Sequence, residues 1–81
     1  MKFVAEIDIM PLPELLDPQG KAVKSALQNL SITATDVRVG KHIRLELEAN
    51  SREEAYQIAQ TACQKLLANP IIESYSLTIH E

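Results

Sequence analysis

The stretch HIRLELEANSREE, residues 42–54, decides the expected fold because it passes from one periodicity to another. Its first eight residues alternate between polar and apolar side chains, which predicts a strand with one buried face. The apolar side chains are Ile43, Leu45, Leu47 and Ala49, and the polar ones are His42, Arg44, Glu46 and Glu48. Ser51 and Glu54 then form a capping box, in which each side chain can bond to the backbone amide of the other. The stretch predicts a strand followed directly by a helix.

Downstream of residue 54 the apolar residues recur at three- and four-residue spacing, which predicts a helix of about four turns. The stripe comprises Ala55, Ile58, Ala59, Ala62, Cys63, Leu66 and Leu67. Asn69-Pro70 ends the helix, because proline disfavours helical geometry in the residue before it. From Ile71 to Ile79 we expect a last strand, with Tyr75, Leu77 and Ile79 on one side.

Upstream of residue 42 the sequence predicts two further strands and a helix. Thr35 to Val39 is expected to form a short strand, joined through a turn at Gly40-Lys41 to the strand at 42–49 as an antiparallel hairpin. Asp17-Pro18 signals the start of a helix, with Asp17 as the cap and Pro18 at the first helical position. Its apolar stripe is Ala22, Val23, Ala26, Leu27 and Leu30, and Gly20 near its start permits close approach of another backbone.

Lys2 to Met10 also has a period of two, with Phe3, Ala5, Ile7 and Ile9 on one side, and Pro11 and Pro13 end this strand. The predicted order is therefore β-α-β-β-α-β. The expected fold class is α+β: a single ferredoxin-like domain over residues 1–81, with a four-stranded antiparallel sheet and both helices on one face.

Composition limits the functions open to this chain. With 81 residues and 9.0 kDa it buries roughly 60–65% of its unfolded surface, so association with another chain is a reasonable expectation. The net charge is −3, and only three residues are aromatic, which argues against a nucleic-acid surface. A single cysteine, Cys63, suits a reducing compartment. The N-terminus does not read as a signal peptide, and there is no apolar run of about 20 residues, so the cytoplasm is expected.

Few residues are candidates for chemistry, and each has a structural explanation. His42 and His80 are expected at the surface, and Cys63 in the core. Glu46 and Glu48 share a strand face and could act as an acid–base pair, although a solvated face explains them as well. Arg38 and Lys41 could hold an anion or a partner's carboxylate. We therefore predict no catalytic, cofactor-binding or metal-binding residue on this chain.

Three segments in order resemble the PurS family: LDPQG at 16–20, DVRVGK at 36–41 and KLLANPIIESY at 65–75. PurS is the small subunit of bacterial and archaeal phosphoribosylformylglycinamidine synthase, in purine biosynthesis. The resemblance implies a homodimer, or sometimes a tetramer, that bridges two catalytic partners. One is a PurL-type synthetase, which binds ATP and magnesium, and the other is a PurQ-type glutaminase. The bridge lets ammonia pass between them, so the chain is non-catalytic alone but part of a ligase complex.

The matched positions imply contact and packing roles only. They are Asp17, Pro18, Gln19, Gly20, Arg38, Gly40, Lys41, Asn69 and Pro70. We select Gln19, Arg38 and Lys41 as subunit contacts, because neither capping nor core burial explains them. The alternative functions are a ligand-sensing regulatory domain of ferredoxin-like fold and a small enzyme that uses Glu46 or His42. Saturable binding of an amino acid or nucleotide to the chain alone would favour the sensor.

Overall fold

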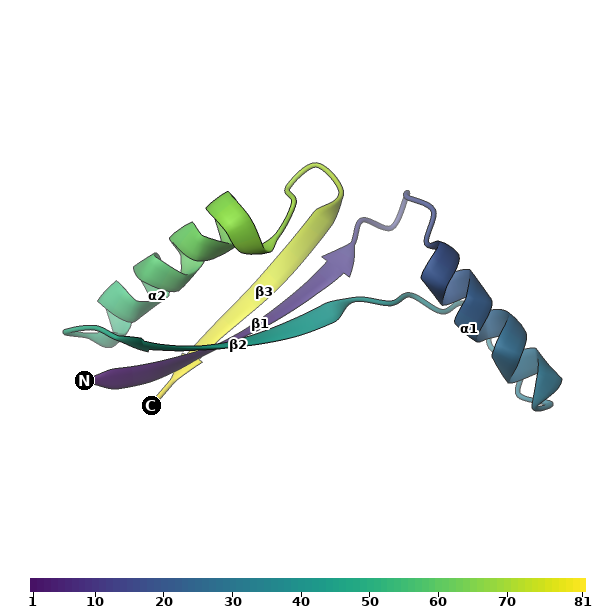
Figure 1. Cartoon of the computed structure of the whole chain (residues 1–81), viewed down its shortest axis with the longest axis horizontal. Helices are drawn as coiled ribbons and strands as arrows, with labels where there is room; N and C mark the ends of the chain where they lie inside the picture. Colours follow the sequence, from purple (N-terminus) through teal and green to yellow (C-terminus); the bar gives the residue numbers. More distant parts are fainter.

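The computed structural model describes residues 1–81 and contains one antiparallel sheet of three strands (Figure 1). Strand β1, Lys2–Pro11, is in the middle, with β2, Lys41–Glu48, on one edge and β3, Glu73–His80, on the other. Ile7 of β1 lies opposite Ile43 of β2 and Leu77 of β3. Because directly paired residues share a face, the apolar sets of the three strands form one apolar surface.

Helix α2, Arg52–Ala62, packs on this apolar face and closes the core. Ala55, Ala59 and Cys63 are fully buried against the apolar residues of β1. The small side chains at four-residue spacing allow the helix backbone to approach the sheet closely. Ser51 caps the helix as predicted, its Oγ accepting from the Glu54 amide at 3.1 Å. The Glu54 carboxylate reaches back to the amide of Asn50 rather than that of Ser51.

The last turn of this helical segment, Cys63–Leu67, is a π-helix, in which the Ala68 amide donates to the Cys63 carbonyl oxygen. A π-turn holds more residues than an α-turn, so each residue in it advances by a smaller angle around the axis. This delay rotates Leu66 out of the predicted stripe, where it is 81% exposed, and brings Leu67 against the core. The predicted burial of Leu66 is therefore wrong.

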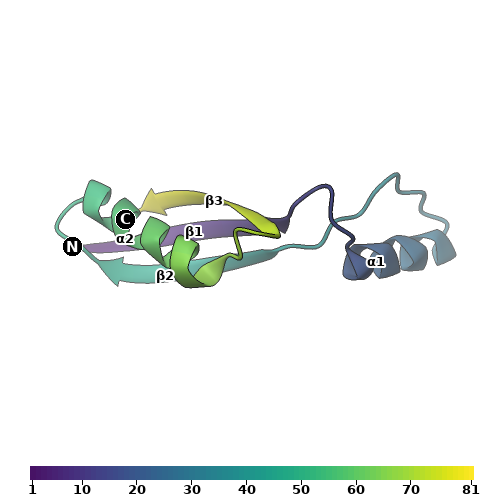
Figure 2. The same ribbon diagram turned by 90° about the horizontal axis from the view of Figure 1, so that it is seen from above.

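Helix α1, Pro18–Asn29, projects away from the sheet (Figures 1 and 2). The chain measures 51 × 25 × 14 Å, and its radius of gyration is 16.1 Å. A compact domain of this length would have a radius of gyration of about 12 Å. The expectation that both helices cover one face is therefore wrong, since only α2 covers the sheet.

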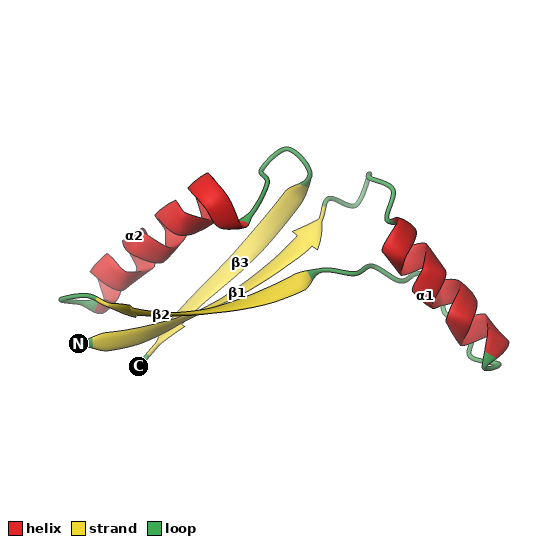
Figure 3. Ribbon diagram, in the orientation of Figure 1, coloured by secondary structure: helices red, strands yellow, loops and turns green.

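The predicted four-stranded sheet is also wrong, because residues 35–39 form no strand (Figure 3). A hairpin with β2 would require the chain to reverse at Gly40, but the chain runs on from α1 into β2 without a turn there. Gly40 serves another purpose. A Cβ at this position would collide with the Ile9 carbonyl oxygen and the Met10 sulfur, so glycine lets the start of β2 lie against the end of β1.

Candidate functional site

Two connections join α1 to the sheet, and we call them together the stalk: residues 12–17, which lead out, and residues 36–40, which lead back. Arg38 bonds the two connections to each other. Its guanidinium donates to the carbonyl oxygens of Leu12 at 2.8 Å, Leu15 at 3.1 Å and Pro13 at 3.4 Å. The planar guanidinium group presents several N–H donors in a fixed geometry, which suits a cluster of carbonyl oxygens.

Asp17 makes the second link in the stalk. Its Oδ1 accepts from the Gly20 amide at 3.0 Å, which confirms the predicted helix cap, and its Oδ2 accepts from the Val39 amide at 2.8 Å. These bonds, that from Val39 foremost and that from Gly20 next, hold the pKa of the Asp17 carboxyl below its usual value. Gly20 permits the close approach that its sequence position suggested, because a Cβ there would collide with the Val37 carbonyl oxygen.

Gln19 and Lys41 lie at the sheet end of the stalk, around a hollow of about 240 Å³ that Asp17 and Glu73 also line. Lys41 Nζ is 3.7 Å from Glu73 Oε2, and its side chain is 54% exposed. Gln19 is exposed on the first turn of α1. The structure thus brings Gln19 and Lys41 together, while Arg38 is engaged inside the chain. Contact of the three with another subunit stays a prediction.

Asn69 and Pro70 lie in the turn before β3, as predicted. Asn69 Oδ1 accepts from the Ile71 amide at 3.1 Å, and the Asn69 amide donates to Glu73 Oε1 at 2.8 Å. The turn is joined to the stalk, since the Leu12 amide donates to the Ile72 carbonyl oxygen at 2.9 Å. The family-like segments at 16–20, 36–41 and 65–75 therefore meet at one end of the sheet.

A cluster of ionisable side chains occupies the face of the sheet opposite α2. His42 Nδ1 is 2.6 Å from Asp8 Oδ1, and His42 Nε2 is 3.0 Å from Glu6 Oε1. His80 Nε2 is 3.1 Å from Glu6 Oε2. A carboxylate only accepts hydrogen bonds, so carboxylates at both ring nitrogens favour the imidazolium form, which has an N–H at each nitrogen. Glu6 thus links histidines from the two edge strands.

This cluster shifts the pKa values of its members in opposite directions. The bond to Asp8, and then that to Glu6, raises the pKa of His42, and the bond to Glu6 raises the pKa of His80. The bonds to His42 and His80 lower the pKa of Glu6. Both histidines are at the surface, as predicted. Their carboxylate partners were missed, although alternation within strands that pair in this order would have placed all four on one face.

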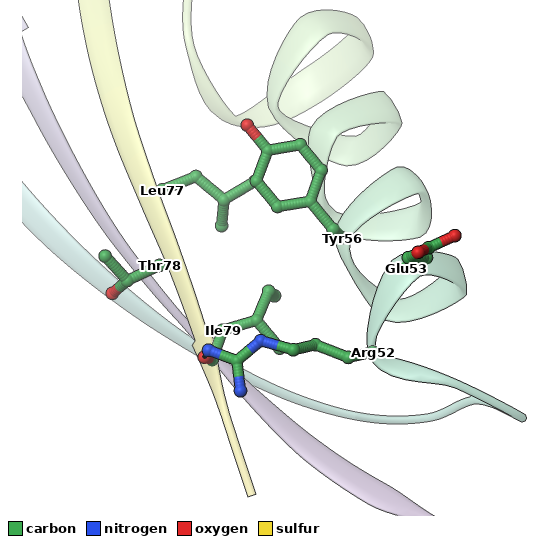
Figure 4. Close-up of a pocket in the computed structure, with 6 residues that line it drawn as sticks. All are labelled: Arg52, Glu53, Tyr56, Leu77, Thr78 and Ile79. Atoms are coloured by element: carbon green, nitrogen blue, oxygen red, sulfur yellow. Dashed lines mark hydrogen bonds between the residues drawn. The ribbon is translucent and has the colours of Figure 1, made fainter.

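A pocket of about 410 Å³ lies between α2 and β3, lined by Arg52, Glu53, Tyr56, Leu77, Thr78 and Ile79 (Figure 4). The Tyr56 ring lies beside Leu77, and Glu53 points away from the strand. The Arg52 guanidinium donates to the Ile79 carbonyl oxygen and so bonds the helix to the edge strand.

The remaining candidates are placed as follows. Cys63 is fully buried, as predicted, and burial raises the pKa of its thiol. Glu46 and Glu48 are exposed on the polar face of β2. No group of three or more His, Cys, Asp or Glu side chains is arranged to hold a metal ion. None of the helices is both long enough and apolar enough to span a membrane.

Comparisons with known proteins agree along nearly the whole chain. The family model described as PurS, phosphoribosylformylglycinamidine (FGAM) synthase, matches residues 4–81. The PurS subunit of Thermotoga maritima is 36% identical over 93% of this chain and 93% of its own length. The corresponding subunit of Synechocystis sp. is 47% identical over 83% of this chain and 68% of its own length.

Solved structures share the extended shape as well as the sequence. A chain in the structure of PurLQS from Thermotoga maritima is 33% identical to this one. The match covers 99% of each chain with a TM-score of 0.91, which includes the projecting α1. The family match, the sequence identity and the shared architecture together show that this chain belongs to the PurS family.

Proposed function

We propose that this chain is a non-catalytic subunit of phosphoribosylformylglycinamidine synthase in de novo purine biosynthesis. It holds a PurL-type synthetase against a PurQ-type glutaminase. The observation that carries the proposal is the match, over 99% of both chains, to a chain in the structure of PurLQS. ATP and magnesium belong to the synthetase partner, and this chain binds no cofactor. We also propose a cytoplasmic location and self-association as a dimer or tetramer.

The chemistry explains why such a complex needs a third subunit. Ammonia released by a glutaminase is lost as a nucleophile when it diffuses into water or takes up a proton. A subunit that binds both enzymes fixes their orientation and raises the effective concentration of ammonia at the synthetase. The shape supports this role, because the sheet with α2 and the projecting α1 offer two well-separated surfaces (Figure 1).

Reconstitution tests the proposal. The purified chain is titrated into synthetase and glutaminase subunits, and amidination is measured with glutamine and, separately, with an ammonium salt. We expect the glutamine-dependent rate to rise to saturation as the chain is added, and the ammonium-dependent rate to change little. A chain with one exposed substitution on α1, Ser25→Ala, should raise the glutamine-dependent rate as the unchanged chain does. Equal glutamine-dependent rates with and without the chain would contradict the bridging role.

A further inference from the structure

Strand β3 is an edge of the sheet, and no other strand lies beyond it (Figure 2). The Leu12 amide donates to the Ile72 carbonyl oxygen, so the backbone groups of Ile72 point toward the continuation of β1. Backbone groups of successive residues in an antiparallel strand point to opposite sides. The even-numbered residues of β3 therefore bond to β1, and the odd-numbered residues point their amide and carbonyl groups outward. These outward residues are Glu73, Tyr75, Leu77 and Ile79.

Contacts within the chain close the two ends of this outward row. The Glu73 amide donates to the Asn69 carbonyl oxygen at 2.7 Å, and the Ile79 carbonyl oxygen accepts from the Arg52 guanidinium. The Glu73 carbonyl and the Ile79 amide stay open, as do both backbone groups of the two outward residues between them. A row of open backbone groups is a template for another strand, and the closed ends limit it to a short one.

Charged side chains protect the other edge of the sheet but not this one. Edge strands of soluble proteins commonly carry charged residues or proline, which discourage pairing with other strands. The side chains on the polar face of β2 are all ionisable: His42, Arg44, Glu46 and Glu48. Those beside the open stretch of β3 are uncharged: Ser74, Ser76 and Thr78. Strand β3 is therefore the edge that is better suited to receive another strand.

The pattern of open and closed groups matches that of a second copy of β3. In an antiparallel pair with Tyr75 opposite Leu77 of the second copy, both backbone groups of these two residues find partners. Glu73 then lies opposite Ile79, so that its open carbonyl meets the open Ile79 amide, and the two groups that are already bonded face each other. A shift of two residues in either direction would set an open group of Tyr75 or Leu77 against one that is already bonded.

The side chains also fit this register. Tyr75 of the second copy would lie beside Leu77, at the pocket of about 410 Å³ between α2 and β3. Leu77 of the second copy would lie beside Tyr75, at a second hollow of about 310 Å³ between Cys63 and the start of β3. Pairs of aromatic and aliphatic side chains stabilise neighbouring strands, and on the other face the two Ser76 residues would meet without like charges.

We infer that β3 of one copy pairs antiparallel with β3 of a second copy, with Tyr75 opposite Leu77, so that two three-stranded sheets join into one. A twofold axis passes between the two Ser76 residues, and each copy presents the same surface to the other. The inference names one surface for the self-association proposed above, and it rests on that part of the proposed function.

Disulfide trapping tests the register. In this pairing the two Ser76 Cα atoms form a non-hydrogen-bonded pair about 4.5 Å apart, which is within the range of a disulfide. We expect oxidation to link Ser76→Cys chains efficiently. Thr78→Cys, on the same face, is the matched control and should give only background linkage, because the two Thr78 residues would lie roughly 13 Å apart. Cys63 stays in place because it is fully buried.

A second measurement uses two variants with the same added charge. Ser76→Lys sets two positive charges directly opposite each other across the axis, whereas Ser74→Lys leaves the added charges roughly 13 Å apart. Analytical ultracentrifugation of the chain alone should show that Ser76→Lys weakens this association about fivefold and that Ser74→Lys leaves it unchanged. Both positions are exposed, and equal melting temperatures would verify that both variants fold.

Equal linkage of the Ser76→Cys and Thr78→Cys chains, or equal association of the two Lys variants, would overturn the inference. Equal association together with weaker binding of Ser76→Lys to a catalytic subunit would assign the edge to a strand of that subunit instead. Linkage and association are measured on the chain alone, so they are separate from the reconstitution assay. If they fail while the glutamine-dependent rate still rises with added chain, the bridging role stands without this interface.

Discussion

The Val39 amide donates a hydrogen bond to the Asp17 carboxylate at 2.8 Å, although the two residues are 22 positions apart in the chain. The second oxygen of the same carboxylate caps α1. The Asp17 side chain therefore caps the start of α1 and also bonds to the connection that leads from α1 back to the sheet. These two hydrogen bonds help to fix the position of α1 relative to the sheet.

Replacement of Asp17 should loosen the stalk in two steps. Asn has one acceptor oxygen where Asp has two, so Asp17→Asn can keep only one of the two bonds, while Asp17→Ala loses both. We expect the melting temperature to fall by roughly 5 °C for Asp17→Ala and by less for Asp17→Asn. Asp36→Ala is the control, since Asp36 bonds only to the next residue, Val37. Equal melting temperatures for all three variants would contradict this account.

Gly20→Ala should destabilise the protein, although alanine is usually the more stable of the two residues in a helix. In an exposed helix, alanine is favoured over glycine by about 1 kcal/mol. Here the added methyl group would collide with the Val37 carbonyl oxygen and crowd the Asp17 carboxylate. We expect a loss of about 1–3 kcal/mol in the free energy of unfolding, measured by urea denaturation. Ser25→Ala in the same helix should be neutral or slightly stabilising. A gain in stability for Gly20→Ala would show that the backbone at Val37 moves aside to accommodate the methyl group, and would contradict this account.

The sequence predicted the elements better than their arrangement. Alternation in β1 and β2, the cap at Asp17 and the burial of Cys63 were all confirmed, because each depends on neighbours within a few residues. The position of α1 could not be predicted from its stripe, which specifies a face to bury and not the molecule that buries it. The engagement of Arg38 with three carbonyl oxygens also depends on tertiary structure, since those carbonyl groups are more than 20 residues away.

Stability should depend on pH through the cluster of His42, His80 and Glu6. The folded pKa values of the histidines are raised, so their contribution is complete below the unfolded value of about 6.5. It is lost as the pH rises through the folded values. The folded pKa of Glu6 is lowered, so its contribution is complete above the unfolded value of about 4.5 and is lost as the pH falls through the folded value. We therefore expect a maximum between about pH 4.5 and 6.5.

Urea denaturation at pH 5.5 and pH 8.5 measures this dependence. The unchanged chain should have the higher midpoint at pH 5.5. In the double variant His42→Gln with His80→Gln, most of the difference should disappear, because glutamine does not titrate. A double variant that keeps the full difference would assign the pH dependence to other groups.

Arg38 and Lys41 should differ in their effect on stability. Arg38 is half-buried in the stalk and bonds to three carbonyl oxygens, so Arg38→Ala should cost about 1–3 kcal/mol. Lys41 makes one exposed ion pair with Glu73, and Lys41→Ala should cost less than about 1 kcal/mol. Chemical denaturation of both variants tests the difference. Equal losses would mean that the Arg38 bonds add little in solution.

Gln19 is the cleanest test of the predicted subunit contacts, because its exposed side chain has no bonded partner in the chain. Gln19→Ala should leave the melting temperature unchanged and weaken binding to the catalytic subunits roughly fivefold. Binding is measured by titration calorimetry with each catalytic subunit. Gln28→Ala, at the other end of α1, is the control. Unchanged affinity for Gln19→Ala would remove this residue from the contact surface.

The projecting helix also has a consequence for turnover of the protein in the cell. An unassembled copy displays a 12-residue helix that is not supported by its own core. Exposed segments of this kind open readily and are preferred sites of cleavage by proteases. Assembly would shield the helix and lengthen the lifetime of the subunit, so copies made in excess of their partners would be degraded first. The exposure of α1 in unassembled copies would thereby keep the cellular amount of this subunit close to the amount of its partners.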